Sequence, residues 1–402
     1  MKRTQHPRIV STSASANMLP HVVQLDGLRA IAVGFVFFHH FIAQQRHEEL
    51  PFELGQIHWG FVGVQLFFIL SGFLITLILL QGRQMAEGVA GGWQYILRQF
   101  YLRRFLRIMP LAYLVIAVAA IFNYRHTREI AGWLASYTIN IQMAIAGVWP
   151  RRFNHFWTLA IEEQFYLVWP FVILCSPRRW MPALIGGAIA LGPIYRCASL
   201  LLGWNDLAVR HLTFAWFDSL AAGALLALLV DQGLGLKASA WLRRVGLPIG
   251  LATTLLLEFW DAIHPHARLT LVFGDLSMTL IGCWLVLGAY YGFSGFWGRL
   301  LSWRPVAYLG KISYGLYVYH LFIRALLNPW LIKIGVHSIV LRALVDSLAS
   351  IAIAAVSWHF FESPINALKR FVPYALPKQS TKKEGVMASR IPSRLEKAEQ
   401  PV

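Results

Sequence analysis

The chain has 402 residues, of which 57% are hydrophobic and 14% are charged, whereas an ordinary soluble domain carries about 25% charged residues. Apolar runs of about 20 residues, long enough to cross a bilayer as helices, recur along most of the chain, which excludes a soluble protein and predicts an all-α, polytopic membrane helix bundle. The net charge of +17 does not indicate nucleic-acid binding, because the basic residues lie in short loops and in the C-terminal tail, where cytoplasmic segments of membrane proteins collect Lys and Arg.

The apolar runs predict about ten transmembrane helices with both termini in the cytoplasm. Residues 1–20 are expected to form a flexible cytoplasmic tail, residues 21–367 the membrane domain, and residues 368–402, which are rich in Lys, Pro and Ser, a disordered basic tail. The expected spans lie near 27–42, 60–80, the segment after Pro110, 156–175, 182–202, 211–230, 245–262, 269–291, 309–330 and 338–361.

The apolar segment 131–148 has two interpretations. As a span it would place every later basic loop outside the cell, whereas as a re-entrant or surface segment it leaves those loops inside. The positive-inside bias favours the second interpretation.

Small residues and cysteines in the apolar runs have structural interpretations. Gly63, Ser71 and Gly72 would allow close helix approach in the second span. All three cysteines lie in apolar runs without the spacing of metal ligands, so we expect core residues and neither a disulfide framework nor a metal site; they are Cys175, Cys197 and Cys283.

Arg29 and His40 stand eleven residues apart in the first span, close to three helical turns, so they share a face with His40 about 16 Å beyond Arg29. An ionisable group at that depth needs a cavity or a partner, and we interpret His40 as a catalytic candidate. The structural alternative is an Arg at a helix end and a hydrogen-bonded His. The neighbouring His39 points to another face.

Arg104 and Arg107 are one turn apart and project together ahead of Pro110. They are either ordinary cytoplasmic charge or a polyanion site, because guanidinium groups bind phosphates in a fork geometry. Arg103 lies beside them. A glycine-rich phosphate loop is missing from the sequence, which argues against a nucleoside triphosphatase.

Glu162 lies at the head of an apolar run, where a carboxylate is costly unless it lines a wet vestibule. Tyr166 is four residues on and can meet Glu162 on one face. Trp157 and Tyr166 are either aromatic-belt residues or, with Glu162, a binding site for a sugar at the outer side.

Ser313, Tyr317 and His320 form a polar stripe at i, i+4 and i+7 on an otherwise apolar helix. Such a stripe either joins helices or supplies functional groups. Asp218 is expected near the membrane edge, with pairing to a nearby Arg as its structural interpretation. Glu362 is expected to be a cap or an ion-pair partner.

Together these motifs resemble the acyltransferase 3 family of integral membrane O-acyltransferases over about residues 20–365. The matching features are an Arg-x10-His pair in the first span, a GV-x-LFF-x-LSGFLI second span, an Arg-x-x-Arg-Ile-x-Pro segment, a Trp-x-Leu-x-x-Glu-x-x-Phe-Tyr motif and an Ile-Ser-Tyr…Tyr…His segment. The chain departs from the family at Trp216, where relatives often carry an Arg ahead of the acid that corresponds to Asp218.

The resemblance implies transfer of an acyl group, with acetyl expected, from cytoplasmic acyl-CoA to a hydroxyl of a carbohydrate, a glycolipid or a glycosylated small molecule. It implies a multi-pass protein of the bacterial inner membrane that needs no metal. Arg29, Arg103, Arg104 and Arg107 would bind the acyl-CoA. His40 would be a general base or a transient acyl carrier, assisted by Glu162 and His320, and the acceptor would contact Trp157, Tyr166, Ser313 and Tyr317.

Two rival functions belong to other classes. A proton-coupled transporter or flippase would use His40, Glu162 and His320 as a proton relay, and a lipid-binding scaffold would tolerate the loss of both His40 and Glu162. Release of thiol from acyl-CoA separates an enzyme from a transporter. Oligomeric state is not predicted.

Overall fold

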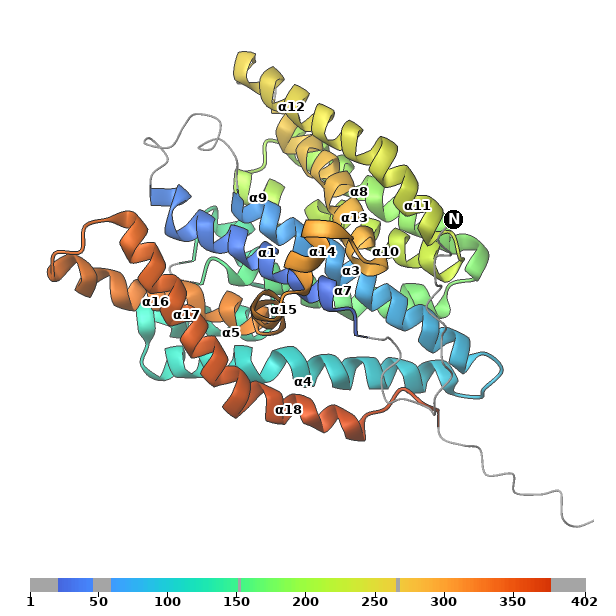
Figure 1. Ribbon diagram of the computed structural model, residues 1–402, viewed down its shortest axis with the longest axis horizontal. Helices are drawn as coiled ribbons and strands as arrows, with labels where there is room; N and C mark the ends of the chain where they lie inside the picture. The colour runs from blue at the N-terminus through green and yellow to red at the C-terminus, as the bar shows by residue number, and fades with distance from the viewer. Residues whose placement is uncertain (1–20, 46–58, 151–152, 265–267, 377–402) are drawn as a thin grey trace, which may run out of the picture.

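The computed structural model describes residues 21–45, 59–150, 153–264 and 268–376, and these form an all-α bundle without strands (Figure 1). The N-terminal tail 1–20 and residues 377–402 lie outside the described residues. The helices are α1 (Val23–Phe41), η1 (Ala43–Gln45), α3 (Trp59–Ala86), α4 (Gly92–Ile121), η2 (Tyr124–His126), α5 (Thr127–Ala135), α6 (Ile139–Ala146), α7 (Phe156–Cys175), η3 (Arg178–Trp180), α8 (Met181–Leu201), α9 (Asp206–His211), η4 (Thr213–Trp216), α10 (Phe217–Asp231), α11 (Gly235–Trp241), η5 (Leu242–Gly246), α12 (Leu247–Ile263), η6 (Thr270–Gly274), α13 (Asp275–Tyr291), α14 (Gly295–Ser302), α15 (Arg304–Lys311), α16 (Ser313–Lys333), α17 (Ile339–Ser357), η7 (Trp358–Glu362), α18 (Ser363–Ala367) and η8 (Leu368–Phe371).

Within the described residues, eight helical stretches are long and apolar enough to cross a membrane, which confirms the polytopic helix bundle and makes the predicted number of ten approximate. The eight stretches are α3, α4, α7, η3–α8, η4–α10, α11–α12, η6–α13 and α17–η8. Helices α1 and α16 have 19 and 21 residues but carry more polar side chains. These two helices also carry the predicted histidines.

Helix α3 runs through the middle of the bundle and contacts α1, α4, α7, α10 and α13 (Figure 1). Both glycines of α3 for which the sequence predicted close helix approach show it. A Cβ at Gly63 would overlap the carbonyl oxygen of Ala32 in α1, and one at Gly72 would overlap that of Leu220 in α10. The Ser71 side chain forms a hydrogen bond to Glu162 of α7.

Helix α4 is one continuous helix with Pro110 inside it, whereas we expected a basic cytoplasmic segment followed by a new span after Pro110. A proline within a helix removes one hydrogen bond but does not always end the helix. The basic residues are accommodated because Arg104 and Arg107 line cavities.

The segment 131–148 is divided between α5 and α6, which have nine and eight residues. Between them Tyr137 adopts a left-handed backbone with φ of 53°. A transmembrane helix needs about 20 residues, so this segment is not a single spanning helix.

Residues 368–376 differ from the disordered tail expected from residue 368 onward. Residues 368–371 form η8, and Tyr374 is only 6% exposed. The reason is a set of hydrogen bonds from α4 to backbone carbonyls of this segment, which composition does not reveal.

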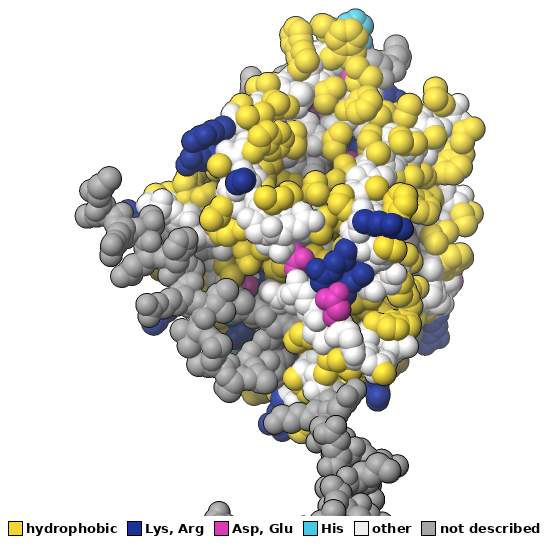
Figure 2. Space-filling model, turned by 90° about the vertical axis from the view of Figure 1, so that its right-hand side faces the viewer, with side chains coloured by type: hydrophobic (Ala, Val, Ile, Leu, Met, Phe, Trp, Pro, Cys, Tyr) yellow, Lys and Arg dark blue, Asp and Glu magenta, His cyan; other side chains and the backbone are white. Residues whose placement is uncertain are grey.

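The surface and the cysteines fit a membrane protein. Basic side chains are spread over the end of the bundle at the right of Figure 1, next to hydrophobic surface (Figure 2). The three cysteines are free, and Cys283 is buried as expected, but Cys175 and Cys197 are exposed. In an apolar helix facing lipid, a small polarizable thiol needs no core position.

Candidate active site

A cavity rich in basic side chains, called here the cationic cavity, lies between α1, α3, α4, α13 and η8 and has a volume of about 340 Å³. Ligand sites typically have about 300–1,000 Å³, so it is large enough for a ligand. Its charged lining residues are His21, Asp26, Arg29, Arg103, Arg104, Arg107 and Lys369, joined by Tyr290 and Tyr374.

A narrower space of about 90 Å³, called the central cavity, adjoins the first. Arg29, Arg104 and Arg107 line both cavities. The two spaces therefore meet at these three guanidinium groups. The polar residues that complete the central cavity are Ser71, Thr158, Glu162, Tyr166, Ser313, Tyr314 and Tyr317.

The arginines of α4 divide into two groups because successive residues of a helix point about 100° apart. Arg104 and Arg107 face the cavities, and the Arg104 guanidinium lies 5.2 Å from the Tyr166 ring centroid, a cation–π distance. Arg103 lines the cationic cavity but donates hydrogen bonds to backbone carbonyls of the C-terminal segment.

Asp26 is a site residue that sequence reasoning missed. Its Oδ1 accepts a hydrogen bond from Arg29 Nη1 at 2.9 Å, and its Oδ2 lies 2.5 Å from His21 Nε2. The i, i+3 spacing of Asp26 and Arg29 on a membrane helix was the available signal. Because Asp26 balances Arg29, the uncompensated charge of the cavities lies mainly on α4.

Glu162 is held by Ser71, whose hydroxyl donates to Glu162 Oε1 at 2.5 Å. The Tyr166 hydroxyl in turn donates to Ser71 Oγ at 3.0 Å. Glu162 and Tyr166 thus lie on one face of α7, as predicted, but they interact through a serine of α3. Ser71 was interpreted only as a small packing residue, so its functional position was missed.

The predicted histidines belong to a cluster at the far end of α1. The His40 ring centroid lies 5.2 Å from that of His320, and His320 lies 5.1 Å from His155. His39 packs on His40 at 5.0 Å, and Arg324 of α16 donates to the His40 carbonyl. His155 was not predicted, although it directly precedes the Glu162 motif.

Hydrogen bonds to backbone carbonyls fix which nitrogen carries the proton in two of these rings. His320 Nδ1 lies 2.6 Å from the Tyr317 carbonyl, and His155 Nε2 lies 3.1 Å from the Val318 carbonyl. A carbonyl only accepts, so these nitrogens donate and the opposite nitrogens carry lone pairs. Within the described residues, His320 Nε2 and His155 Nδ1 have no hydrogen-bond partner.

The histidine cluster and the central cavity meet at one wall. The hydroxyls of Thr158 and Tyr317, which line the cavity, lie 2.6 Å apart, and the Tyr317 hydroxyl donates to the His155 carbonyl at 2.9 Å. The predicted stripe on α16 is therefore divided, with Ser313 and Tyr317 lining the cavity and His320 beyond it. His40 does not line either cavity, but its cluster contacts the wall.

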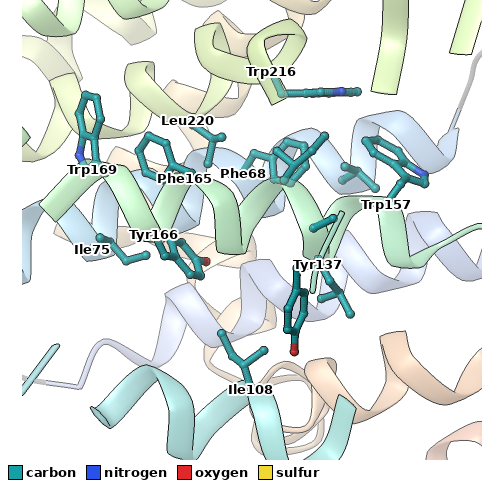
Figure 3. Packing of buried hydrophobic residues seen from close by; sticks show 14 of the residues in the cluster. Phe68, Ile75, Ile108, Tyr137, Trp157, Phe165, Tyr166, Trp169, Trp216 and Leu220 are labelled. Atoms are coloured by element: carbon teal, nitrogen blue, oxygen red, sulfur yellow. The ribbon is translucent and has the colours of Figure 1, made fainter. Parts of the chain in front are cut away.

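Trp157 does not line the cavity, contrary to the sequence interpretation. It is 5% exposed and packs among Phe61, Trp216 and His211, on the side of α7 opposite Tyr166 (Figure 3). Burial lowers the pKa of His211 to about 3, so this ring is a neutral packing partner. Thr158, the next residue of the helix, faces the cavity instead, because successive side chains of a helix point about 100° apart.

Asp218 has the Arg partner considered as its alternative, whereas the Glu362 side chain forms neither a helix cap nor an ion pair within the described residues. Asp218 Oδ2 accepts a hydrogen bond from Arg196 Nη2 at 2.6 Å, and both side chains are fully buried. Glu362 Oε1 accepts from Ser357 at 3.0 Å. Neither carboxylate lines the two cavities.

The chain is similar in sequence to acyltransferases. A family model described as an acyltransferase domain matches residues 22–361. Peptidoglycan O-acetyltransferase OatA of Listeria monocytogenes is 28% identical over 370 residues, covering 86% of this chain and 56% of that protein. The putative peptidoglycan O-acetyltransferase YrhL of Bacillus subtilis is 28% identical over 373 residues, covering 86% and 55%.

O-acetyltransferase OatA of Staphylococcus aureus is 26% identical over 398 residues, covering 89% of this chain and 59% of that protein. The chain thus spans somewhat more than half the length of the curated relatives it matches. No solved structure matches it.

Proposed function

The chain belongs to the membrane acyltransferase family whose domain it matches over residues 22–361, and from that premise we propose that it transfers an acyl group, acetyl, from acyl-CoA to a hydroxyl of a carbohydrate or glycoconjugate. The observation that carries the proposal is that the two cavities share Arg29, Arg104 and Arg107 in their walls. The cationic cavity suits phosphates, and the central cavity leads towards side chains that can accept or donate protons.

The donor would enter at the cationic cavity. Arg104 and Arg107 would bind the phosphates of coenzyme A, because guanidinium forks match phosphate oxygens, and Arg29, held by Asp26, would border the passage. The pantetheine arm is a narrow chain and suits the smaller central cavity, which ends at the wall formed by Thr158 and Tyr317.

The transfer would take place at that wall. The acceptor hydroxyl oxygen attacks the thioester carbon, its proton goes to a neutral imidazole, the C–S bond breaks, and coenzyme A leaves as a thiolate that is then protonated. His320 Nε2 and His155 Nδ1, which carry lone pairs and have no hydrogen-bond partner within the described residues, support this chemistry. We assign His40 as base or acyl carrier, with His320 as its proton-transfer partner, and Glu162 as the group that orients the acceptor or accepts its proton.

The acceptor class is proposed from two sources. Three of the relatives above are named as O-acetyltransferases, two of them of peptidoglycan, and Glu162 with Tyr166 and Ser71 offers the polar groups that bind sugar hydroxyls. We place the protein in a bacterial inner membrane with both termini cytoplasmic, which puts the cationic cavity on the side where acyl-CoA is made.

Purified protein in detergent with acetyl-CoA and glycan acceptors tests the proposal. Thiol release that depends on the acceptor, and an acetylated product seen by mass spectrometry, are expected. His40→Ala should abolish both at unchanged folded yield. Replacing Arg104 and Arg107 by Gln should raise the KM for acetyl-CoA far more than that for the acceptor. Acceptor movement across vesicles without thiol release would contradict the enzyme assignment.

A further inference from the structure

The segment 363–376 continues from α17 and runs along α4, and α18 lies beside α4 in Figure 1. Two side chains of α4 hold its backbone. Arg103 Nη1 donates to the carbonyls of Lys369 and Val372 at 3.0 and 2.9 Å. The Tyr95 hydroxyl contacts the carbonyls of Pro373 and Ala375 at 3.0 and 3.1 Å. Because the acceptors are backbone carbonyls, the path of this segment depends little on the segment's own sequence.

This path brings Lys369 and Tyr374 into the wall of the cationic cavity. The Tyr374 ring is buried, with the Arg103 guanidinium 5.1 Å from its centroid. Burial raises the pKa of the Tyr374 phenol, so the ring remains neutral and the cavity wall gains no negative charge from it.

The charges around this cavity are unbalanced. Its acid, Asp26, is occupied by Arg29 and His21. In the part of the chain that the structure describes, Arg104, Arg107 and Lys369 form no ion pair, and Lys369 Nζ contacts the neutral Asn366 Oδ1 at 2.5 Å. Basic groups that outnumber the acids around them repel one another when charged, so the arrangement favours a ligand with several negative groups, which would also hold the Lys369 amine in its charged form.

We propose that residues 368–374 are part of the donor site, with Lys369 as a third phosphate-binding cation and Arg103 as the positioning residue that holds the segment in place. The ligand class is a phosphorylated nucleotide with a diphosphate and a separate phosphate, as in a coenzyme A thioester, so the inference rests on the proposed function. The segment lies beyond residue 361, where the family match ends.

The test is coenzyme A binding by the purified full-length protein in neutral detergent, measured by titration calorimetry. Lys369→Gln should raise the Kd about tenfold, the loss of one charge-assisted contact, and raise the KM for acetyl-CoA but not for the acceptor. Lys369→Arg should restore most of the affinity. Arg370→Gln, at the exposed neighbouring position, is the matched control and should bind like the wild type.

A double-mutant comparison tests the positioning role of Arg103. Arg103→Gln should weaken coenzyme A binding by a similar factor, and adding Lys369→Gln should cause little further loss, because both changes remove the same contact. Fully additive losses would show that Arg103 does not act through the segment.

The outcomes separate the inference from the proposed function. Wild-type binding that Lys369→Gln leaves unchanged overturns the inference alone, whereas a wild type that does not bind coenzyme A overturns both. A Lys369→Gln protein that loses retention of added phosphatidylglycerol but keeps its coenzyme A affinity would show a lipid headgroup site, and would also overturn the inference.

Discussion

Two groups of charged side chains lie beside α3, and they use the same residue types in opposite ways. In the first, Arg196 and Asp218 are paired at 2.6 Å with both side chains fully buried. In the second, Arg104, Arg107 and Glu162 border open space. Helix α3 contributes to both, with Gln65 beside the first and Ser71 in the second.

The difference lies in the remaining hydrogen-bond donors. Arg196 also donates to the carbonyls of Val272 and Ala215, and Asp218 Oδ1 accepts from the Ser219 N–H at 2.8 Å. A buried charge with every donor used stabilises the bundle but has none left for a ligand. Charged groups that face a cavity and lack a counter-ion are the ones that suit a substrate.

The largest expected effect is on the paired group. Arg196→Met should lower the stability of the folded bundle by about 3–5 kcal/mol, because Asp218 would be left buried without its partner. Thermal unfolding and yield of monodisperse protein measure this. A double variant, Arg196→Met with Asp218→Leu, should recover much of the loss, and a stable single variant would contradict the comparison.

Glu162→Gln should show the reverse pattern. We expect kcat to fall about 100-fold or more, the range for loss of a group that moves or directs a proton, while the melting temperature changes by less than about 3 °C. The Gln side chain keeps an oxygen for the Ser71 hydroxyl. Unfolding as severe as that of Arg196→Met would assign Glu162 to structure.

Arg324→Met tests whether the end of α1 is positioned by α16. The Arg324 side chain donates to the His40 carbonyl, one of the last carbonyls of α1, which have no partner within the helix. A fall in kcat of about tenfold, with KM for acetyl-CoA unchanged and recovery in Arg324→Lys, is expected. An increase in KM of the same size as the fall in kcat would argue against a positioning role.

Ser71→Ala removes the hydroxyl between Tyr166 and Glu162. A loss of about 1 kcal/mol, or about fivefold in kcat/KM for the acceptor, follows from one hydrogen bond. Ser71→Thr keeps the hydroxyl and serves as the control. An unchanged acceptor kcat/KM in the alanine variant would remove Ser71 from the site.

Trp157→Phe should have the smallest effect. The ring packs among aromatic side chains away from the cavity, so kcat/KM for the acceptor should change by less than about twofold, with a modest loss of stability for the smaller side chain. A large increase in the acceptor KM would restore Trp157 to the sugar-binding role predicted from the sequence.

Much of the fold and part of the site could be predicted because apolar runs and helical spacing report on them directly. The spacing correctly grouped Glu162 with Tyr166 and Ser313 with Tyr317, whereas His320 of the same stripe lies beyond the cavity. It could not show that Trp157 points into the core, because an aromatic residue suits either a cavity or a packed interface. Ser71 was missed because its size suggested close packing.

The C-terminal segment was missed for a different reason. Local composition predicts disorder when a segment has no apolar period, but residues 368–376 are held by donors from α4 that act on backbone carbonyls. Backbone acceptors are the same in every sequence. Only the three-dimensional path of α4 shows that Arg103 and Tyr95 are available to them.

The close approaches at Gly63 and Gly72 also bear on how substrates enter. At these two positions the α3 backbone lies directly against the backbones of α1 and α10, and we expect the three helices to move together as a rigid body. Any gating motion that admits a bulky acceptor must then come from the opposite walls, where α4, α7 and α16 meet through side chains that can change rotamer.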